Sequence, residues 1–175
     1  ALDGNTAVVG VPLDDGAGAD QGSVYVFVRS GGGWTFQAKL AAADGAAGDQ
    51  FGFAFALSGD TLVIGSVFDD VASANQGSVY VFTRSGSSWT QQQKLTASDG
   101  AADDHFGIAI ALSGNTFIAG AADDDLNGAD QGSAYVFTRS GITWTQQQKL
   151  TAGDGAAGDR FGRGVALDGE TALVG

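Results

Sequence analysis

The chain repeats itself every 55 residues, and this period constrains its fold more than any other feature. Residues 1–6 recur at 56–61, 111–116 and 166–171, and Trp34, Trp89 and Trp144 obey the same spacing. So do the pairs Phe51-Gly52, Phe106-Gly107 and Phe161-Gly162. A repeat of this length predicts an array of small supersecondary units that bury their apolar faces against one another rather than within a single unit.

Each period contains four strand-like runs separated by clusters of glycine, aspartate and serine. In the third copy, run A covers 106–112, run B 116–120, run C 133–139 and run D 144–151. The turn 113–115 joins runs A and B as a tight hairpin in which glycine supplies the positive φ. No run has helical spacing, so the sequence predicts four-stranded antiparallel meanders.

The polarity of the runs predicts their order within each meander. Run C is apolar on both faces, as in 24–29, and therefore suits a middle strand. Run A alternates bulky phenylalanine with glycine and alanine, which suits a crowded axis. Run D is the most polar, as in 91–94, and suits an outer edge. The inner-to-outer order A, B, C, D is that of a β-propeller blade, whereas the rival β-solenoid repeats on shorter periods.

The predicted fold class is all-β: β-propeller blades built from 55-residue repeats, in an incomplete ring or an open array. Residues 1–50 should hold strands B, C and D of a first blade, 51–105 a second blade, 106–160 a third, and 161–175 strands A and B of a fourth. Natural propellers close with about four to eight blades. Three completions are open: a longer parent chain that closes at about seven blades, separate chains that close a ring, or copies that run head to tail into a filament.

The Phe-Gly pairs, together with Gly10-Val11-Pro12 and its counterparts at 65–67 and 120–122, resemble the FG-GAP repeat, a family that includes the propeller of integrin α subunits. The strings at 76–82 and 85–90 are most similar to bacterial extracellular FG-GAP repeat proteins. The resemblance implies a β-propeller. Integrin-type repeats place an aspartate-rich calcium loop between runs A and B, and this chain has only the short turns 58–60 and 113–115 there. That calcium site is therefore not carried over.

Charge and composition limit the classes of partner that the chain is expected to bind. The chain has 20 acidic against 8 basic residues and a formal charge of −12, which argues against nucleic acid. It has no apolar run long enough to span a membrane, so no membrane insertion is expected, and it has no cysteine for disulfides or thiolate metal sites. The expected partners are further copies of the chain or further blades of the same parent chain, with extracellular protein or glycan beyond them. The expected location is extracellular or at the cell surface.

The aspartates gather in the B–C and D–A loops, which emerge at the same end of an up-and-down meander. Carboxylate oxygens on loops are the ligands that calcium prefers, so the sequence predicts a calcium site on this acidic face. The candidate ligands are Asp14, Asp15, Asp20, Asp69, Asp70, Asp124, Asp125 and Asp130. In the alternative interpretation, aspartate serves only turn chemistry and solubility.

The sequence predicts that the protein is not an enzyme, because no nucleophile with a partner base recurs. His105 occurs once, where the other copies have Gln50 and Arg160, and is expected to be a surface variant. The tryptophans are expected to be packing anchors, with a sugar-stacking row as the alternative. The predicted function is a non-enzymatic extracellular structural or adhesive module, self-associating or part of a longer propeller or filament. The alternative is a lectin-like propeller that binds glycans between blades.

Overall fold

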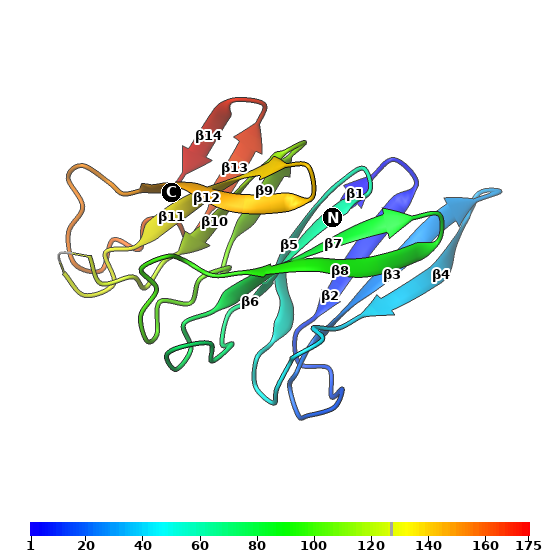
Figure 1. Cartoon of the computed structure of the whole chain (residues 1–175), viewed down its shortest axis with the longest axis horizontal. Helices are drawn as coiled ribbons and strands as arrows, with labels where there is room; N and C mark the ends of the chain where they lie inside the picture. Colours follow the sequence, from blue (N-terminus) through cyan, green and yellow to red (C-terminus); the bar gives the residue numbers. More distant parts are fainter. Residues whose placement is uncertain (127) are drawn as a thin grey trace.

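The computed structural model describes residues 1–126 and 128–175, and all regular structure in this part of the chain is β (Figure 1). Three four-stranded antiparallel sheets follow one another, and a two-stranded sheet follows the third. The first sheet contains β1 (Leu2–Asp3), β2 (Thr6–Val11), β3 (Ser23–Ser30) and β4 (Gly33–Leu40). The second contains β5 (Phe51–Ser58), β6 (Thr61–Ser66), β7 (Ser78–Ser85) and β8 (Ser88–Leu95). The third contains β9 (Ile110–Ser113), β10 (Thr116–Ala121), β11 (Ser133–Ser140) and β12 (Thr143–Leu150), and the last contains β13 (Val165–Asp168) and β14 (Thr171–Val174).

The prediction of all-β blades in an open arrangement is confirmed. We call the three four-stranded sheets blades 1, 2 and 3, and β13–β14 the half-blade. Within each blade the strands lie in chain order, each antiparallel to the next. Blade 1 includes the two-residue strand β1 in addition to the three strands expected in residues 1–50. No helix long and apolar enough to cross a bilayer occurs among the described residues.

The apolar core lies between blades rather than inside them. We call the contact between two neighbouring blades a joint, and the contacts between blades 1 and 2 and between blades 2 and 3 the two full joints. At the first joint, Val8, Val24 and Val26 of blade 1 pack against Leu62 and Ile64 of blade 2, and all five are buried. The second joint buries the opposite face of blade 2 against blade 3 in the same way. Each such side chain contributes about 1.5–3 kcal/mol on burial. A blade therefore depends on its neighbours for most of its stability.

Two glycines per joint bring the backbones of neighbouring blades into direct contact. A Cβ added to Gly65 in β6 would lie 2.2 Å from the carbonyl oxygen of Gly107, which follows Phe106. The same contact pairs Gly10 with Gly52 and Gly120 with Gly162. Gly107 also has a φ of +96°, a conformation that favours glycine. The Phe-Gly pair and the glycine after strand B are thus two halves of one contact.

The ladder between the third and fourth strands of every blade contains a β-bulge. In blade 1 the register changes from Val26 opposite Ala38 to Phe27 opposite Phe36, which leaves Gln37 as the extra residue. Gln92 and Gln147 are the extra residues in blades 2 and 3. A bulge redirects the side chain of the extra residue, and here that residue is glutamine in all three blades.

Candidate functional site

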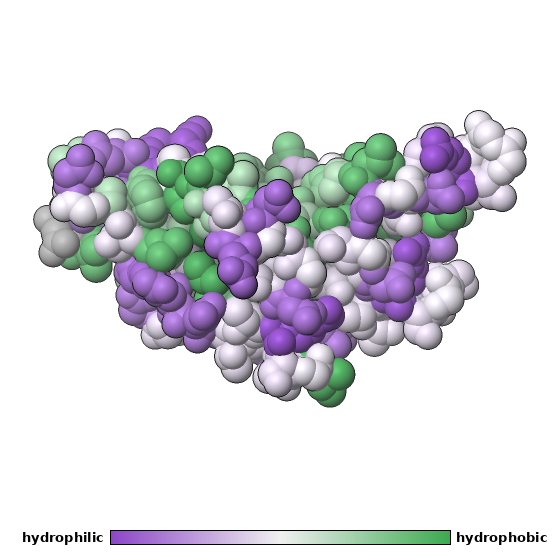
Figure 2. All heavy atoms as spheres, turned by 90° about the horizontal axis from the view of Figure 1, so that it is seen from above, coloured by the Kyte–Doolittle hydropathy of each residue, from purple (hydrophilic) through white to green (hydrophobic). Residues whose placement is uncertain are grey.

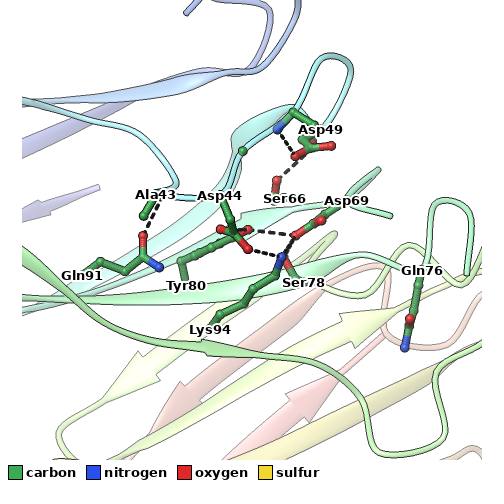
Figure 3. Close-up of polar contacts among 12 residues, drawn as sticks. Ala43, Asp44, Asp49, Ser66, Asp69, Gln76, Ser78, Tyr80, Gln91 and Lys94 are labelled. Carbon is green, nitrogen blue, oxygen red and sulfur yellow. Dashed lines mark hydrogen bonds and ion pairs between the residues drawn. The ribbon is translucent and has the colours of Figure 1, made fainter. Parts of the chain in front are cut away.

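A repeated polar cluster at the loop end of each joint is the most organised polar feature of the molecule. At the first joint it centres on Asp69, in the loop that follows β6 (Figure 3). The carboxylate accepts a hydrogen bond from Ser78 Oγ, and its Oδ2 lies 2.7 Å from Lys94 Nζ and 2.9 Å from Tyr80 Oη. Asp69 itself is buried. The cluster therefore satisfies a buried carboxylate from three sides.

The fourth member of the cluster comes from the preceding blade. Asp44, in the loop after β4, lies 2.7 Å from Lys94 Nζ through Oδ2 and 3.0 Å from Tyr80 Oη through Oδ1 (Figure 3). The tyrosine has one proton and can donate it to only one of the two carboxylates at a time. At the second joint, Asp99 and Asp124 hold Tyr135 and Lys149 in the same way. A loop aspartate from one blade thus locks the tyrosine and lysine of the next.

The electrostatics follow from this packing. Burial alone would raise the pKa of Asp44, but hydrogen bonds from Lys94 and Tyr80 outweigh it and hold that pKa below its ordinary value. The pKa of Asp99 is lowered for the same reasons. Burial would lower the pKa of Lys94, yet the surrounding carboxylates raise it above its ordinary value. Both partners stay charged across the physiological pH range, so the cluster is a set of ion pairs.

A second aspartate at each full joint is buried without a lysine. Asp49 is 4% exposed and its Oδ2 accepts the backbone N–H of Ala46 at 2.7 Å. Asp104 is 2% exposed and accepts the N–H of Ala101 at 2.6 Å. Burial raises the pKa of both carboxyls. Sequence reasoning grouped these aspartates with the other loop acids, although their fixed place five residues after Asp44 and Asp99 was the available signal.

The candidate calcium ligands fall into two structural classes. Asp14, Asp69 and Asp124 are paired with lysine, at 2.7, 2.7 and 2.6 Å. Asp15, Asp70 and Asp125 instead close their own loops, where each Oδ1 accepts the backbone N–H of the residue five positions later, at 3.0, 2.7 and 2.7 Å. That fifth residue is Asp20 in the first loop and Asp130 in the third, each in the left-handed region of φ.

Across residues 1–126 and 128–175, no group of three or more histidine, aspartate or glutamate side chains is arranged to hold a metal ion. The calcium site therefore stays a prediction. A cavity of about 670 Å³ opens beside the first polar cluster, between the loop 44–50 and the loop 68–75. Asp44, Asp49, Asp69, Asp70 and Lys94 all line it. The cavity is polar and carries more acidic than basic groups.

The tryptophans of blades 2 and 3 are enclosed in the joints, as the packing-anchor interpretation expects. Trp144 is 1% exposed, packs on Phe117 at 5.1 Å between ring centroids, and lies under the guanidinium of Arg139. Trp89 donates Nε1–H to the bulge residue Gln37 at 3.0 Å. Trp34, on the outer face of blade 1, is 44% exposed. The three rings therefore form no continuous exposed row.

The second joint lacks the hydrogen bond between the tryptophan ring and the bulge glutamine that Trp89 and Gln37 form at the first joint. Trp144 Nε1 and Gln92 Oε1 are the counterparts of the bonded pair at the first joint, and both atoms are buried there without a hydrogen-bond partner. In their place, Gln93 exchanges two hydrogen bonds of 2.9 Å with the backbone of Trp144. The two joints share a plan while differing in this detail.

Arginines in the third strand also cross the joints, a role that the sequence did not indicate. Arg84 donates from Nη1 to Thr6 Oγ1 of blade 1 at 2.8 Å and from Nε to Asp60 of its own blade at 2.7 Å. Arg139 contacts Thr61 of blade 2 and Asn115 of its own blade in the same way. Thus one arginine per joint links the two blades at the end opposite the B–C and D–A loops. We call the end that carries these loops the loop face.

His105 is placed in the second D–A loop with a φ of 54°. Its Nδ1 lies 2.7 Å from Asp123 Oδ2, and its ring meets Phe68 edge-on at 5.0 Å. Arg160 Nε lies 3.2 Å from the other oxygen of Asp123. The histidine is thus a partly buried side chain that joins a small cluster between the second and third periods.

The FG-GAP repeat model matches residues 1–27, 34–82, 89–137 and 144–175. Each internal match begins at the tryptophan of a fourth strand and ends in the third strand of the next blade, so the matched unit spans a joint. A comparison with curated proteins finds no significant match. The family match covers most of the chain in four segments, and the Phe-Gly pairs with their partner glycines lie at the contacts between blades. The chain belongs to the FG-GAP repeat family.

Proposed function

We propose that the protein is a non-enzymatic extracellular structural or adhesive module that works by stacking blades, as part of a longer propeller or filament or by self-association. The observation that carries this proposal is the repetition of one contact set at both full joints. The glycine contact, the loop aspartate on tyrosine and lysine, and the crossing arginine all recur 55 residues apart. Because the same contacts recur at each joint, further blades can be added to the array through the same contacts.

The membership of the family supports this assignment, because FG-GAP repeats form propeller modules that are generally non-catalytic and typical of surface proteins. The outer face of blade 1 supports it as well. Val9, Trp34 and Phe36 on that face are 49%, 44% and 59% exposed, whereas Ile64 and Trp89, the equivalents of Val9 and Trp34 in blade 2, are covered by a neighbouring blade. Exposed apolar patches of this kind mark surfaces that bind protein. Seen from above, the molecule has green apolar groups interspersed with purple hydrophilic side chains, and the green groups gather mainly away from the blade 1 end (Figure 2).

The loop face supplies the second interaction surface. It is acidic, and the sequence-based prediction of calcium belongs here. The carboxylates without a lysine partner, such as Asp15 and Asp70, are the ones free to share an ion with backbone carbonyls and water. Calcium, extracellular protein and glycan are the proposed ligands of this face.

Electron microscopy with mass determination, in calcium and in chelator, tests the proposal. Closed discs or long filaments built from this unit are the expected result. A monodisperse chain that forms neither, and that fails to adhere to cell-wall or matrix material in a binding assay, contradicts it.

A further inference from the structure

The side chains around the cavity beside the first polar cluster fall into two groups. The first group is charged and occurs in every copy of the repeat, and its members are Asp44, Asp49, Asp69, Asp70 and Lys94. Four of these five are labelled in Figure 3. The second group differs from copy to copy, and its members are Gln50, Phe68, Val71 and Asn75. The repeat thus supplies the charged groups, and the individual sequence of the first joint sets the rest of the wall.

The equivalent place at the second joint is bridged by side chains. His105 and Asp123 stand there at the positions of Gln50 and Phe68, and their Nδ1 and Oδ2 atoms lie 2.7 Å apart. A phenyl ring has no carboxylate for Gln50 to bond, so the two loops of the first joint are not joined in this way. The space between them has a volume of about 670 Å³. Sites for small ligands commonly have volumes of about 300–1,000 Å³.

The wall of this cavity carries polar atoms that the protein leaves unbonded. Asp49 is 4% exposed, and one of its oxygens, Oδ2, accepts the backbone N–H of Ala46. Its Oδ1 has no hydrogen-bond partner within residues 1–126 and 128–175. The same holds for Oδ2 of Asp70, whose Oδ1 accepts the N–H of Asn75, and for the side-chain amide of Gln50. A buried acceptor without a donor costs about 1–3 kcal/mol, so these atoms favour a ligand that brings donors.

The charges in the wall limit the class of that ligand. Lys94 is the one cation among the described lining residues, and Asp44 and Asp69 already share it at 2.7 Å each. The net charge of the wall is therefore negative, which disfavours phosphates, uronic acids and other anions. The described acidic side chains do not form a group of three that could hold a metal ion. Separate acceptors suit a neutral ligand with several hydroxyl groups better than a single point charge.

An aromatic side chain lies among these acceptors. Phe68 is half-buried, lines the cavity, and its ring is fixed by an edge-on contact with His105 at 5.0 Å between ring centroids. Val71, which is 45% exposed, adds a second apolar group to the same wall. A pyranose ring has hydroxyl donors around its edge and C–H groups on its faces. An aromatic ring with hydrogen-bond acceptors around it therefore matches a sugar in both respects.

We propose that the cavity at the first joint binds a neutral pyranose unit of a glycan. Phe68 packs against the apolar face of the sugar, and the free oxygens of Asp49 and Asp70 accept its hydroxyl protons. The amide of Gln50 bonds a further hydroxyl group, and His105 is a positioning residue that holds the ring of Phe68. This inference rests on the adhesive function proposed above, because it names the class of ligand for one site on the loop face.

A glycan array probed with the 175-residue chain, followed by titration calorimetry in the presence of a chelator, tests the proposal. The titrated probes are methyl α-mannoside, methyl β-galactoside and N-acetylglucosamine, with glucuronic acid as the anionic comparison. At least one neutral probe should bind without calcium, because the protein oxygens bond the hydroxyl groups directly. Glucuronic acid should not bind, because its carboxylate would meet the carboxylates of Asp49 and Asp70.

Three variants locate the binding in the cavity. The double variant Gln50→His/Phe68→Asp introduces the bridge of the second joint and should abolish binding, while circular dichroism shows an intact fold. Phe68→Leu introduces the aliphatic side chain of the first copy and should weaken binding by roughly two- to tenfold. Asp70→Asn removes one acceptor and should weaken binding by about fivefold. Asp125→Asn is its matched control, because Asp125 makes the same bond in its own loop without lining the cavity.

The proposal is overturned if no neutral probe binds up to about 10 mM. Binding by the double variant that equals the wild type also overturns it, and so do equal losses in Asp70→Asn and Asp125→Asn. A chain that binds no sugar but builds discs or filaments refutes this inference and leaves the proposed function standing. A chain that binds sugar in the cavity but neither adheres nor builds discs or filaments supports the inference and refutes the proposed function.

Discussion

The contact between Gly65 and Gly107 yields the sharpest prediction about stability. In Gly65→Ala the new Cβ would lie 2.2 Å from the carbonyl oxygen of Gly107 and 3.0 Å from its carbonyl carbon. To reach an ordinary contact of roughly 3.4 Å, the two backbones must separate by about 1 Å. No flexible side chain can absorb this movement, because backbone atoms face each other on both sides. The second joint must therefore open.

Overpacking typically costs about 1–3 kcal/mol, and a contact between two backbones belongs at the upper end of that range. For a chain of this size each kcal/mol lowers the melting temperature by roughly 2–4 °C, so Gly65→Ala should melt about 6–12 °C below the wild type. Far-ultraviolet circular dichroism measures the midpoint. Tryptophan emission should shift to longer wavelength, because Trp144 lies buried in the joint that opens.

Gly33→Ala is the matched control. No atom lies within 4 Å of a Cβ added to Gly33, and its φ is outside the positive range. Its midpoint should stay within about 1 kcal/mol of the wild type, on the stabilising side, because alanine restricts the unfolded chain. If the two variants melted together, the glycine contact would not hold the blades in register, and the reasoning would be refuted.

Four further predictions concern the loop face and the joints. Asp44→Asn should cost roughly 1 kcal/mol at pH 7, the upper range for a partly exposed ion pair. Because the pKa of Asp44 is lowered in the folded state, the difference measured by urea denaturation should be lost as the pH falls through that lowered pKa. Asp49→Asn should have the opposite sign, stabilising at neutral pH and converging with the wild type in acid, because burial raises the pKa of Asp49; destabilisation at pH 7 would argue against a buried charge. Trp144→Ala should cost about 3–5 kcal/mol and Trp34→Ala less than about 1 kcal/mol, and equal costs would contradict their different burial. Millimolar calcium should raise the melting temperature if the loop face binds the ion, and an unchanged midpoint in the wild type and in Asp70→Asn would leave these aspartates as turn residues.

The fold was predictable because the period is visible in the sequence. Four runs per 55 residues, with glycine turns at fixed places, specify antiparallel blades, and the gradient in polarity from 51–57 to 91–94 orders their strands. The Phe-Gly pairs pointed to the family for the same reason. These features are local, so one copy of the repeat contains them.

The joints were not predictable to the same degree, because they depend on side chains about 50 residues apart. Gln37 was grouped with a polar outer edge, and only the bulge in the ladder directs it towards Trp89 of the next blade. Asp44 and Asp49 are both loop aspartates in the sequence, yet one is paired with lysine and the other is buried without one. The five-residue spacing distinguishes the two positions in each copy, but it does not tell which of them meets the lysine of the following blade.

Asp44 binds side chains that come later in the sequence, and this order has a consequence for synthesis on the ribosome. The aspartate lies in the loop that leaves blade 1, and its partners Tyr80 and Lys94 belong to the blade made next. When the residues of blade 2 leave the ribosome, the loop that carries this carboxylate has already been synthesised. Asp99 has the same relation to Tyr135 and Lys149 of blade 3. Each of these ion pairs can therefore form as soon as the following blade has been synthesised, and it does not depend on residues further along the chain.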